Sequence, residues 1–247
     1  MSAKAATASF AVSADVKNYK GYMDGILVVD KPQGCTSHDI VDFIRKKFGL
    51  KKVGHAGTLD PMATGVLVIL IGKFTKLSNS FLGADKEYDA TLTLGGTSDT
   101  GDAWGKITPG VSTPGVENGI IEDVFKRFIG PIEQVPPAYS AVKFKGRKLY
   151  EFARKGIEVK VEPRKIVIKE LKIYKIEGQE VSFVTTCSKG TYIRQLCIDI
   201  GKELECGAYL SRLRRTRSGD FTIKEATALE ELKGMDTETL KKRLRSA

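Results

Sequence analysis

A single carboxylate, Asp60, stands in a loop of unusual composition in the first quarter of the chain. Residues 53–65 contain three glycines, one proline and one of only two histidines. Glycine admits backbone angles that other residues avoid, and Pro61 restricts both its own φ and the preceding Asp60. We therefore predict a shaped loop that presents Asp60, a residue type that can act as a nucleophile or as a general base. A plain Asp-Pro turn without a catalytic role has the same sequence signature.

The charge of the chain favours an anionic partner. The formal net charge is +10 and the pI is about 9.3, which fits a nucleic acid or an acidic membrane. Between Ser140 and Lys175, twelve Lys and Arg residues stand against four Glu residues, a net +8 over 36 residues. Aromatic residues interleave this stretch, as in an electrostatic track with stacking platforms for bases: Tyr139, Phe144, Tyr150 and Phe152.

A second basic cluster contains Arg212, Arg214, Arg215 and Arg217. It alternates with Leu210 and Leu213, and an alternation of period two predicts a strand with Arg212 and Arg214 on one face and Leu213 on the other. A solvated surface without a ligand has the same pattern, but two basic stretches together favour nucleic-acid binding.

Composition also excludes several classes of protein. The longest apolar run, 66–71, is too short to cross a membrane. The first 20 residues lack the apolar core of a signal peptide and contain no arginine, so we interpret them as a disordered tail of a cytoplasmic protein. The cysteines show no C-x-x-C spacing, which predicts free buried thiols and no metal site: Cys35, Cys187, Cys197 and Cys206.

Hydrophobic periodicity predicts strands and helices in alternation, without repeats or linkers. Expected strands cover 25–30, 66–71, 88–94, 157–161, 166–176 and 181–186. Expected helices cover a segment that Ser37 caps and Gly49 ends, a short stretch over 74–81, and 121–128, 148–155 and 193–204. Residues 97–116 are expected to form a long loop, and one further helical segment is expected around 226–232.

Eight short motifs follow one another along the chain: GILVVDKPQG (25–34), HAGTLDP (55–61), DKEY (85–88), PAYSAVK (137–143), GRKLYE (146–151), CSKGTYIR (187–194), GAYL (207–210) and LRR (213–215). With these motifs in this order, the chain resembles the TruB-type tRNA pseudouridine synthases over about residues 21–223. Thr58 before Leu59-Asp60 indicates this subfamily, since other pseudouridine synthase families carry a different residue there.

The resemblance implies an α+β protein with the pseudouridine synthase fold, a mixed, mostly antiparallel, bent sheet flanked by helices and loops around a central RNA-binding cleft. It implies a catalytic domain over 21–223 with an RNA-gripping thumb insertion at about 136–165. Residues 224–247 are expected to be a helical and basic tail. Bacterial members of the family usually carry a C-terminal PUA RNA-binding domain. The roughly 25 residues after 223 are too few to form one, and the part of the family pattern that this departure affects is binding of the acceptor end of tRNA.

The activity that the resemblance implies is that of an isomerase, which converts the T-loop uridine at position 55 of tRNA to pseudouridine. The base is flipped out, the glycosidic bond is cleaved and the base is rejoined through carbon. The family needs no cofactor and no metal. The implied partner is the T arm of tRNA, and we expect a monomer with no membrane association and no obligatory protein partner.

In the family, Asp60 corresponds to the catalytic carboxylate. It can attack the base or the sugar, or remove a sugar proton, and the sequence does not choose among these routes. Enclosure in a pocket favours the neutral form of a carboxyl group, so a cation is needed nearby, and Arg194 corresponds to it. Tyr88 corresponds to the residue that stacks on the target base and assists proton removal. Without the motifs, Arg194 and Tyr88 have the signatures of a surface helix residue and an ordinary strand residue.

The remaining site residues are expected to bind substrate. Lys31 and Pro32 correspond to the pocket floor, and Leu213 to an apolar contact of the base, although a turn and a core position explain them equally. His55 corresponds to a residue that fills the space left by flipped bases. The other residues assigned to substrate binding are Gly57 in the loop and Lys143, Arg147 and Lys148 in the thumb.

Two other functions compete with this interpretation. An RNA chaperone would fold tRNA without chemistry, but Asp60, Tyr88 and Arg194 are all present. A guide-RNA-dependent synthase of the archaeal and eukaryotic type relies on a PUA domain and protein partners, and the absence of that domain from the sequence argues against it.

Overall fold

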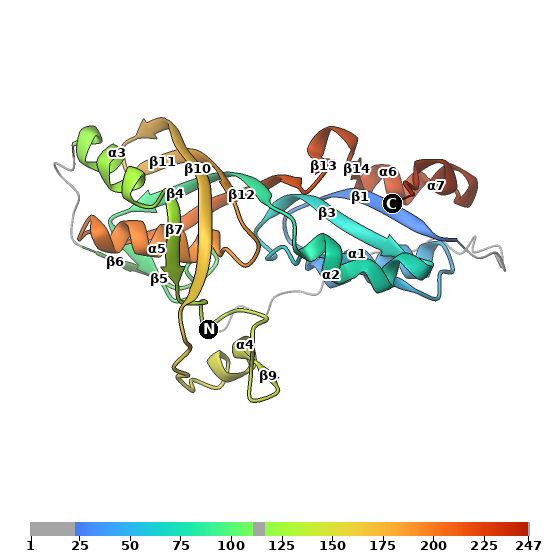
Figure 1. Ribbon diagram of the computed structural model, residues 1–247, viewed down its shortest axis with the longest axis horizontal. Helices are drawn as coiled ribbons and strands as arrows, with labels where there is room; N and C mark the ends of the chain where they lie inside the picture. Colours follow the sequence, from blue (N-terminus) through green and yellow to red (C-terminus); the bar gives the residue numbers. More distant parts are fainter. Residues whose placement is uncertain (1–22, 111–116, 247) are drawn as a thin grey trace. The chain divides into compact units, whose positions relative to one another are not determined.

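The computed structural model describes residues 23–110 and 117–246, which fold as two compact units (Figure 1). Unit 1 comprises the described residues up to Lys86 together with those from Arg214 onward, and unit 2 runs from Glu87 to Leu213. The two divisions of the chain fall inside strands β4 (Lys86–Leu94) and β12 (Ala208–Ser218). The expected catalytic region 21–223 therefore contributes to both units, and the expected tail 1–20 lies outside the described residues.

In unit 1 the central strand is β3 (Thr64–Ile71). Its residues Gly65–Ile71 pair antiparallel with the whole of β1 (Gly25–Lys31), and it pairs antiparallel with β2 (Val53–Ala56) on its other side. The first residues of β3 also pair in parallel with Arg214 and Arg215 of β12. Short strands β13 (Phe221–Thr222) and β14 (Thr227–Ala228) pair with β12 and β1.

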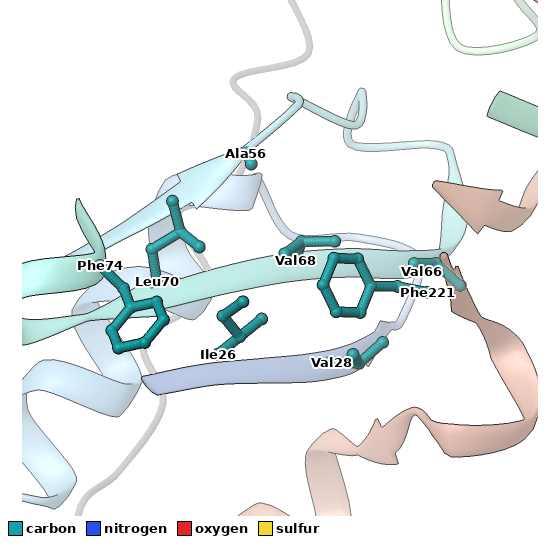
Figure 2. Close-up of a cluster of buried hydrophobic side chains, with 8 residues drawn as sticks. All are labelled: Ile26, Val28, Ala56, Val66, Val68, Leu70, Phe74 and Phe221. Carbon is teal, nitrogen blue, oxygen red and sulfur yellow. The ribbon is translucent and has the colours of Figure 1, made fainter. Parts of the chain in front are cut away.

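The runs of apolar residues in β1 and β3 explain this arrangement, because strands with two buried faces read as continuous rather than alternating hydrophobic segments. Side chains from four strands and the segment after β3 form one buried cluster, which Figure 2 shows: Ile26, Val28, Ala56, Val66, Val68, Leu70, Phe74 and Phe221. Ala56 in this cluster immediately precedes the loop that carries Asp60, so the loop starts from the core.

Helix α1 (Ser37–Lys47) has its N-cap residue one position earlier than expected. The cap is Thr36, whose hydroxyl accepts from the backbone N–H of Asp39 at 3.1 Å, while Asp39 accepts from the backbone N–H of Thr36 at 2.8 Å. The expectation that Ser37 caps the helix is wrong, because the reciprocal hydrogen bonds of Thr36 and Asp39 form the cap. The expected end is confirmed: Gly49 has φ +62°, just after the helix. A 3-10 turn η1 (Gly72–Leu77) and helix α2 (Ser78–Leu82) form the expected short helical stretch.

The C-terminal segment is an ordered part of unit 1. It forms η2 (Ile223–Glu225), α6 (Leu229–Gly234) and α7 (Thr237–Arg243). After α7 the chain returns to β1, where Arg245 and Ile26 exchange two backbone hydrogen bonds of 2.9 Å. The side chain of Arg245 pairs with Glu225 at 2.5 Å. Part of the basic charge expected in a tail is therefore used within unit 1.

In unit 2 the strand order is β12-β4-β11-β10-β7, with β7 (Gly130–Gln134), β10 (Arg164–Glu177) and β11 (Glu180–Cys187). Helices α3 (Asn118–Arg127) and α5 (Ile193–Glu203) confirm the expected helical periodicity. Phe125 of α3 packs edge-on against Phe183 of β11 with ring centroids 5.4 Å apart. This contact fixes α3 against the sheet.

Three expectations about unit 2 are wrong. The expected loop 97–116 contains a hairpin, β5 (Gly96–Ser98) and β6 (Ile107–Pro109), although residues 111–116 lie outside the described ranges. A strand at 130–134 was not expected, because Gly and Pro begin it; β7 is an edge strand, where Pro is tolerated. The expected strand 157–161 is not formed: among residues 23–110 and 117–246 this alternating segment has no pairing partner, and it lines a cavity of about 800 Å³ instead.

The thumb segment of unit 2 consists of a small hairpin and one helical turn, visible in yellow below the sheet in Figure 1. The hairpin pairs β8 (Lys143–Phe144) with β9 (Arg147–Lys148), and α4 (Leu149–Ala153) follows. Lys145 and Gly146 both have positive φ, 47° and 83°, as a tight two-residue hairpin turn requires.

All four cysteines are buried and free, as expected. Within residues 23–110 and 117–246, no helix is long and apolar enough to span a membrane.

Candidate active site

The loop between β2 and β3 places Asp60 at the start of a tight turn. The backbone N–H of Ala63 donates to the carbonyl of Asp60 at 3.0 Å, which closes a four-residue turn with Pro61 at its second position. Gly57 and Gly65, on either side of the turn, have φ of +95° and +100°. The glycine and proline content of the segment thus corresponds to a defined backbone path, with Asp60 half-buried.

Arg215 holds one end of this loop. Its side chain is 1% exposed, and its guanidinium donates to the carbonyl of Gly57 at 2.9 Å and to that of Val66 at 2.7 Å. A Cβ added at Gly65 would lie 2.2 Å from the backbone carbonyl oxygen of Arg215, so only glycine fits there. The expectation that Arg215 belongs to a basic cluster suited to RNA is wrong, because its side chain is buried inside unit 1.

The other arginines of that cluster also make contacts within their own unit. Arg214 pairs with Asp30 at 2.6 Å, and Arg217 donates to the carbonyl of Gly219 at 2.9 Å. Arg212, which belongs to unit 2, pairs with Asp89 at 2.8 Å, and it is the most exposed of the four. The expected alternation is confirmed, since Leu213 is buried while Arg212 and Arg214 are not.

Lys31 supports the turn from the end of β1. Its side chain is fully buried, and its ammonium group donates to the carbonyls of Cys35 at 2.7 Å, Pro32 at 2.9 Å and Pro61 at 3.5 Å. Burial lowers the pKa of Lys31 to about 8, although the nearby Cys35 and Asp60 act in the opposite direction. The ammonium group of Lys31 thus links Pro32 to Pro61, the residue that follows Asp60, and the role of Lys31 and Pro32 as a pocket floor stays a prediction.

His55 lies on β2 opposite Ile69 of β3. Burial lowers its pKa, and the positive charge of Arg215 lowers it further, so the ring is neutral at pH 7. Its Nδ1 atom is buried and has no hydrogen-bond partner among the described residues. A neutral ring of this kind is suited to apolar or stacking contacts rather than to ion pairing.

Unit 2 carries the other residues expected to take part in the reaction. Tyr88 on β4 is 9% exposed, and Leu213 on the neighbouring strand β12 is 6% exposed. Both side chains are buried in the unit, as the plain strand interpretation also requires.

Arg194 is the second residue of α5, as expected, but it is not a surface residue: it is 4% exposed. Its guanidinium donates to the carbonyl of Thr100 at 2.7 Å and to that of Tyr139 at 2.8 Å. Its Nε atom lies 3.8 Å from a carboxylate oxygen of Asp102, which is 7% exposed. Two other segments of unit 2, one with Thr100 and Asp102 and one with Tyr139, therefore orient this buried cation.

Asp102 was not expected from the sequence to contact Arg194. Its second carboxylate oxygen accepts from the hydroxyl of Thr100 at 2.8 Å and from the backbone N–H of Trp104 at 3.1 Å. The signal available in the sequence was an aspartate beside the only tryptophan in a polar, glycine-rich stretch. That signal was weak because such stretches are usually plain loops.

The thumb exposes the cations expected to bind RNA, Lys143, Arg147 and Lys148. Three of its aromatic rings make contacts within the thumb, and of these Phe144 packs edge-on against Phe152 at 6.1 Å. Tyr150 carries cations over its ring, with Lys148 at 5.4 Å and Arg154 at 5.2 Å. The surface of the thumb is therefore mainly one of positive charge.

The expected site residues divide between the units. Unit 1 brings together the residues around the Asp60 turn, namely Asp60, Lys31, Pro32, His55 and Gly57. Unit 2 holds Tyr88, Arg194, Leu213, Lys143, Arg147 and Lys148. The interaction of Arg194 with Asp60 stays a prediction.

Comparisons with protein families and with individual proteins agree on one family for this chain. Residues 45–193 match the family described as "TruB family pseudouridylate synthase (N terminal domain)", and residues 194–247 match the "tRNA pseudouridylate synthase B C-terminal domain". The tRNA pseudouridine synthase B of Syntrophotalea carbinolica is 49% identical over 217 residues, 87% of this chain and 71% of that protein. The Psychrobacter cryohalolentis protein of the same name is 45% identical over 221 residues, 87% of this chain and 62% of that protein.

Among solved structures, the crystal structure of a Cbf5-Nop10-Gar1 complex contains a chain that is 31% identical, with a TM-score of 0.71 over 97% of this chain and 67% of that one. The fold expected from the sequence, a mixed and mostly antiparallel sheet with helices, is confirmed as the pseudouridine synthase fold. The chain belongs to the TruB family, and its enzyme class is that of the isomerases known as tRNA pseudouridine synthase B.

Proposed function

We propose that the protein converts the uridine at position 55 of the tRNA T loop to pseudouridine, with Asp60 as its catalytic carboxylate. The observation that carries this proposal is the loop around Asp60, where the buried side chains of Lys31 and Arg215 hold backbone carbonyls on both sides of the carboxylate. A group that must reach one atom of a bound nucleotide is effective when it is held in the productive geometry beforehand.

The reaction conserves all atoms. The bond between N1 of the base and C1′ of the sugar breaks, and a bond between C5 and C1′ forms. C5 then loses a proton, and N1 gains one. Asp60 attacks the base or the sugar, or removes a sugar proton; each of these steps requires its carboxylate to be ionised.

Arg194 is proposed to supply the charge that keeps Asp60 ionised. Its guanidinium is already buried and oriented by two backbone carbonyls and Asp102, which supports a role that needs a fixed direction. Tyr88 is proposed to stack on the flipped base and to assist the removal of the C5 proton, while Leu213 packs against the base.

The substrate is proposed to be gripped through its phosphates by the exposed cations of the thumb, Lys143, Arg147 and Lys148. A base that leaves the T loop costs a few kcal/mol in lost stacking. The neutral ring of His55 is proposed to offset part of this cost in the space that the flipped bases leave. We also propose that the protein acts in the cytoplasm. It is further proposed to be a monomer, which sedimentation at assay concentrations tests.

The test uses purified protein, an unmodified tRNA transcript and no guide RNA, with pseudouridine mapped along the whole transcript. We expect conversion at position 55 alone, none in a transcript with cytidine there, and none with the Asp60→Asn variant. Conversion at other positions instead of 55, or turnover by Asp60→Asn, would contradict the proposal.

A guide-RNA-dependent function is the second candidate, because the Cbf5 chain shares this fold at 31% identity. The higher identity to tRNA pseudouridine synthase B proteins, 45–49%, favours action on tRNA without a guide. Activity that appears only when guide RNA and partner proteins are added would support the second candidate.

A further inference from the structure

Ser37, the first residue of α1, is buried at 1% exposure and contacts the loop that carries Asp60. Its hydroxyl accepts from the backbone N–H of Leu59 at 2.8 Å and donates to the carbonyl oxygen of Leu59 at 3.0 Å. One side chain thus satisfies both polar backbone groups of the residue immediately before Asp60. In the part of the chain that the structure describes, neither group has another hydrogen-bond partner.

The helix does not need this hydroxyl. A serine at a helix start commonly caps it, but here Thr36 and Asp39 form the reciprocal cap. The side chain of Ser37 is therefore used entirely for a contact with a segment 22 residues away in sequence. The contact belongs to the loop and not to the helix.

The position of the contact determines what it controls. The carbonyl of Leu59 belongs to the peptide group that joins Leu59 to Asp60, and Ser37 fixes the plane of that group. The carbonyl of Asp60 belongs to the next peptide group, and Ala63 fixes that one through the turn. With both flanking planes held, the φ and ψ angles of Asp60 are set, and so is the direction of its Cα–Cβ bond.

We propose that Ser37 is a positioning residue for the isomerisation, which directs the Asp60 carboxylate by holding the Leu59–Asp60 peptide group. The proposal rests on the proposed catalytic role of Asp60. Ser37 touches neither substrate nor the reacting atoms, so its removal changes the rate of the chemical step and leaves tRNA binding to the thumb cations.

The test compares Ser37→Ala with Thr36→Ala, its neighbour at the same helix end. Three quantities are measured for each: the single-turnover rate with saturating enzyme, the Kd for tRNA, and the Tm. Thr36→Ala removes the cap and should lower the Tm, since loss of a cap costs about 1 kcal/mol. Ser37→Ala should lower the single-turnover rate by about 10- to 100-fold, because small misplacements of a catalytic group have effects of that order. Its Kd should change by less than about threefold, since it removes no phosphate contact.

A rate for Ser37→Ala equal to that of wild type, or an equal fall in rate for Thr36→Ala, would overturn the proposal. If Ser37→Ala does not fold, Ser37→Cys keeps the size of the side chain with a weaker donor and acceptor, and should show a smaller fall in rate at unchanged Kd. A Cys variant with the wild-type rate would equally overturn it. Asp60→Asn is assayed in parallel: turnover by that variant rejects the proposed function itself, whereas an inactive Asp60→Asn beside a fully active Ser37→Ala rejects only the role of Ser37.

Discussion

The loop of Asp60 and the thumb are both short segments outside the main sheet strands, but they are held in opposite ways. Buried side chains from three other segments donate to backbone carbonyls of the loop region: Lys31, Ser37 and Arg215. The thumb hairpin is held by local contacts, such as Phe144 against Phe152, and its cations face solvent. The difference indicates that a segment that presents a reacting group is fixed by the core, whereas a segment that presents charge needs only a local scaffold.

The largest effect is expected from Asp60 itself. Asp60→Asn keeps the shape of the side chain but can neither attack nor accept a proton, so isomerisation should be abolished while the Kd for tRNA stays near that of wild type. Pseudouridine mapping and filter binding measure the two quantities. Deamidation restores Asp, so mass spectrometry of the purified variant serves as the control. Turnover beyond the deamidated fraction would show that the fixed loop serves some other purpose.

The second-largest effect is a difference in stability between alanine substitutions of one glycine in each region. Gly65 at the start of β3, next to the loop, and Gly146 in the thumb both have positive φ, +100° and +83°, so alanine is strained at either position by about 1–3 kcal/mol. Only Gly65 also meets backbone, since its added Cβ would lie 2.2 Å from the carbonyl oxygen of Arg215, while nothing lies within 4 Å of that at Gly146. Gly65→Ala should therefore lower the free energy of unfolding by more than about 4 kcal/mol, and Gly146→Ala by no more than the strain alone.

Urea unfolding of the two variants measures this difference. Equal losses at both positions would mean that the close approach of Arg215 does not constrain the loop, and the contrast between the two segments would disappear.

A smaller effect concerns Lys31 and pH. The pKa of Lys31 is lowered by burial from 10.5 to about 8, so between these values the unfolded chain binds more protons than the folded one. Stability therefore rises with pH through this window, by up to about 3 kcal/mol for a shift of this size. The free energy of unfolding of wild type minus that of Lys31→Met should increase between pH 7 and pH 10. A flat difference would mean that Lys31 is solvated in the folded protein.

The same contrast explains what could be predicted from the sequence. The strands of the core and the identity of the Asp60 loop were accessible because continuous apolar runs and the glycine–proline pattern act locally. The roles of Arg215, Ser37 and Asp102 were not, since each depends on a contact with a segment distant in the chain. An arginine in an alternating strand has the same local pattern whether it faces solvent or, like Arg215, the interior. The segment 157–161 shows the converse, because its alternation suits a strand but no strand of the described part of the chain pairs with it.

The smallest effect on catalysis is expected in the thumb, where exposed cations are proposed to contact phosphates. Each phosphate contact contributes roughly 0.7–0.9 to the slope of log K against log salt concentration. Neutralising Lys143, Lys145, Arg147 and Lys148 together should therefore weaken tRNA binding and flatten that slope by up to about three units. Once tRNA is saturating, turnover should change little, because the loop of Asp60 is fixed by contacts within unit 1. A matched control neutralises four lysines in the C-terminal segment of unit 1, Lys224, Lys233, Lys241 and Lys242, and should leave most of the slope in place. If the thumb variant keeps the wild-type slope while the control loses it, the C-terminal segment and not the thumb carries the phosphate contacts.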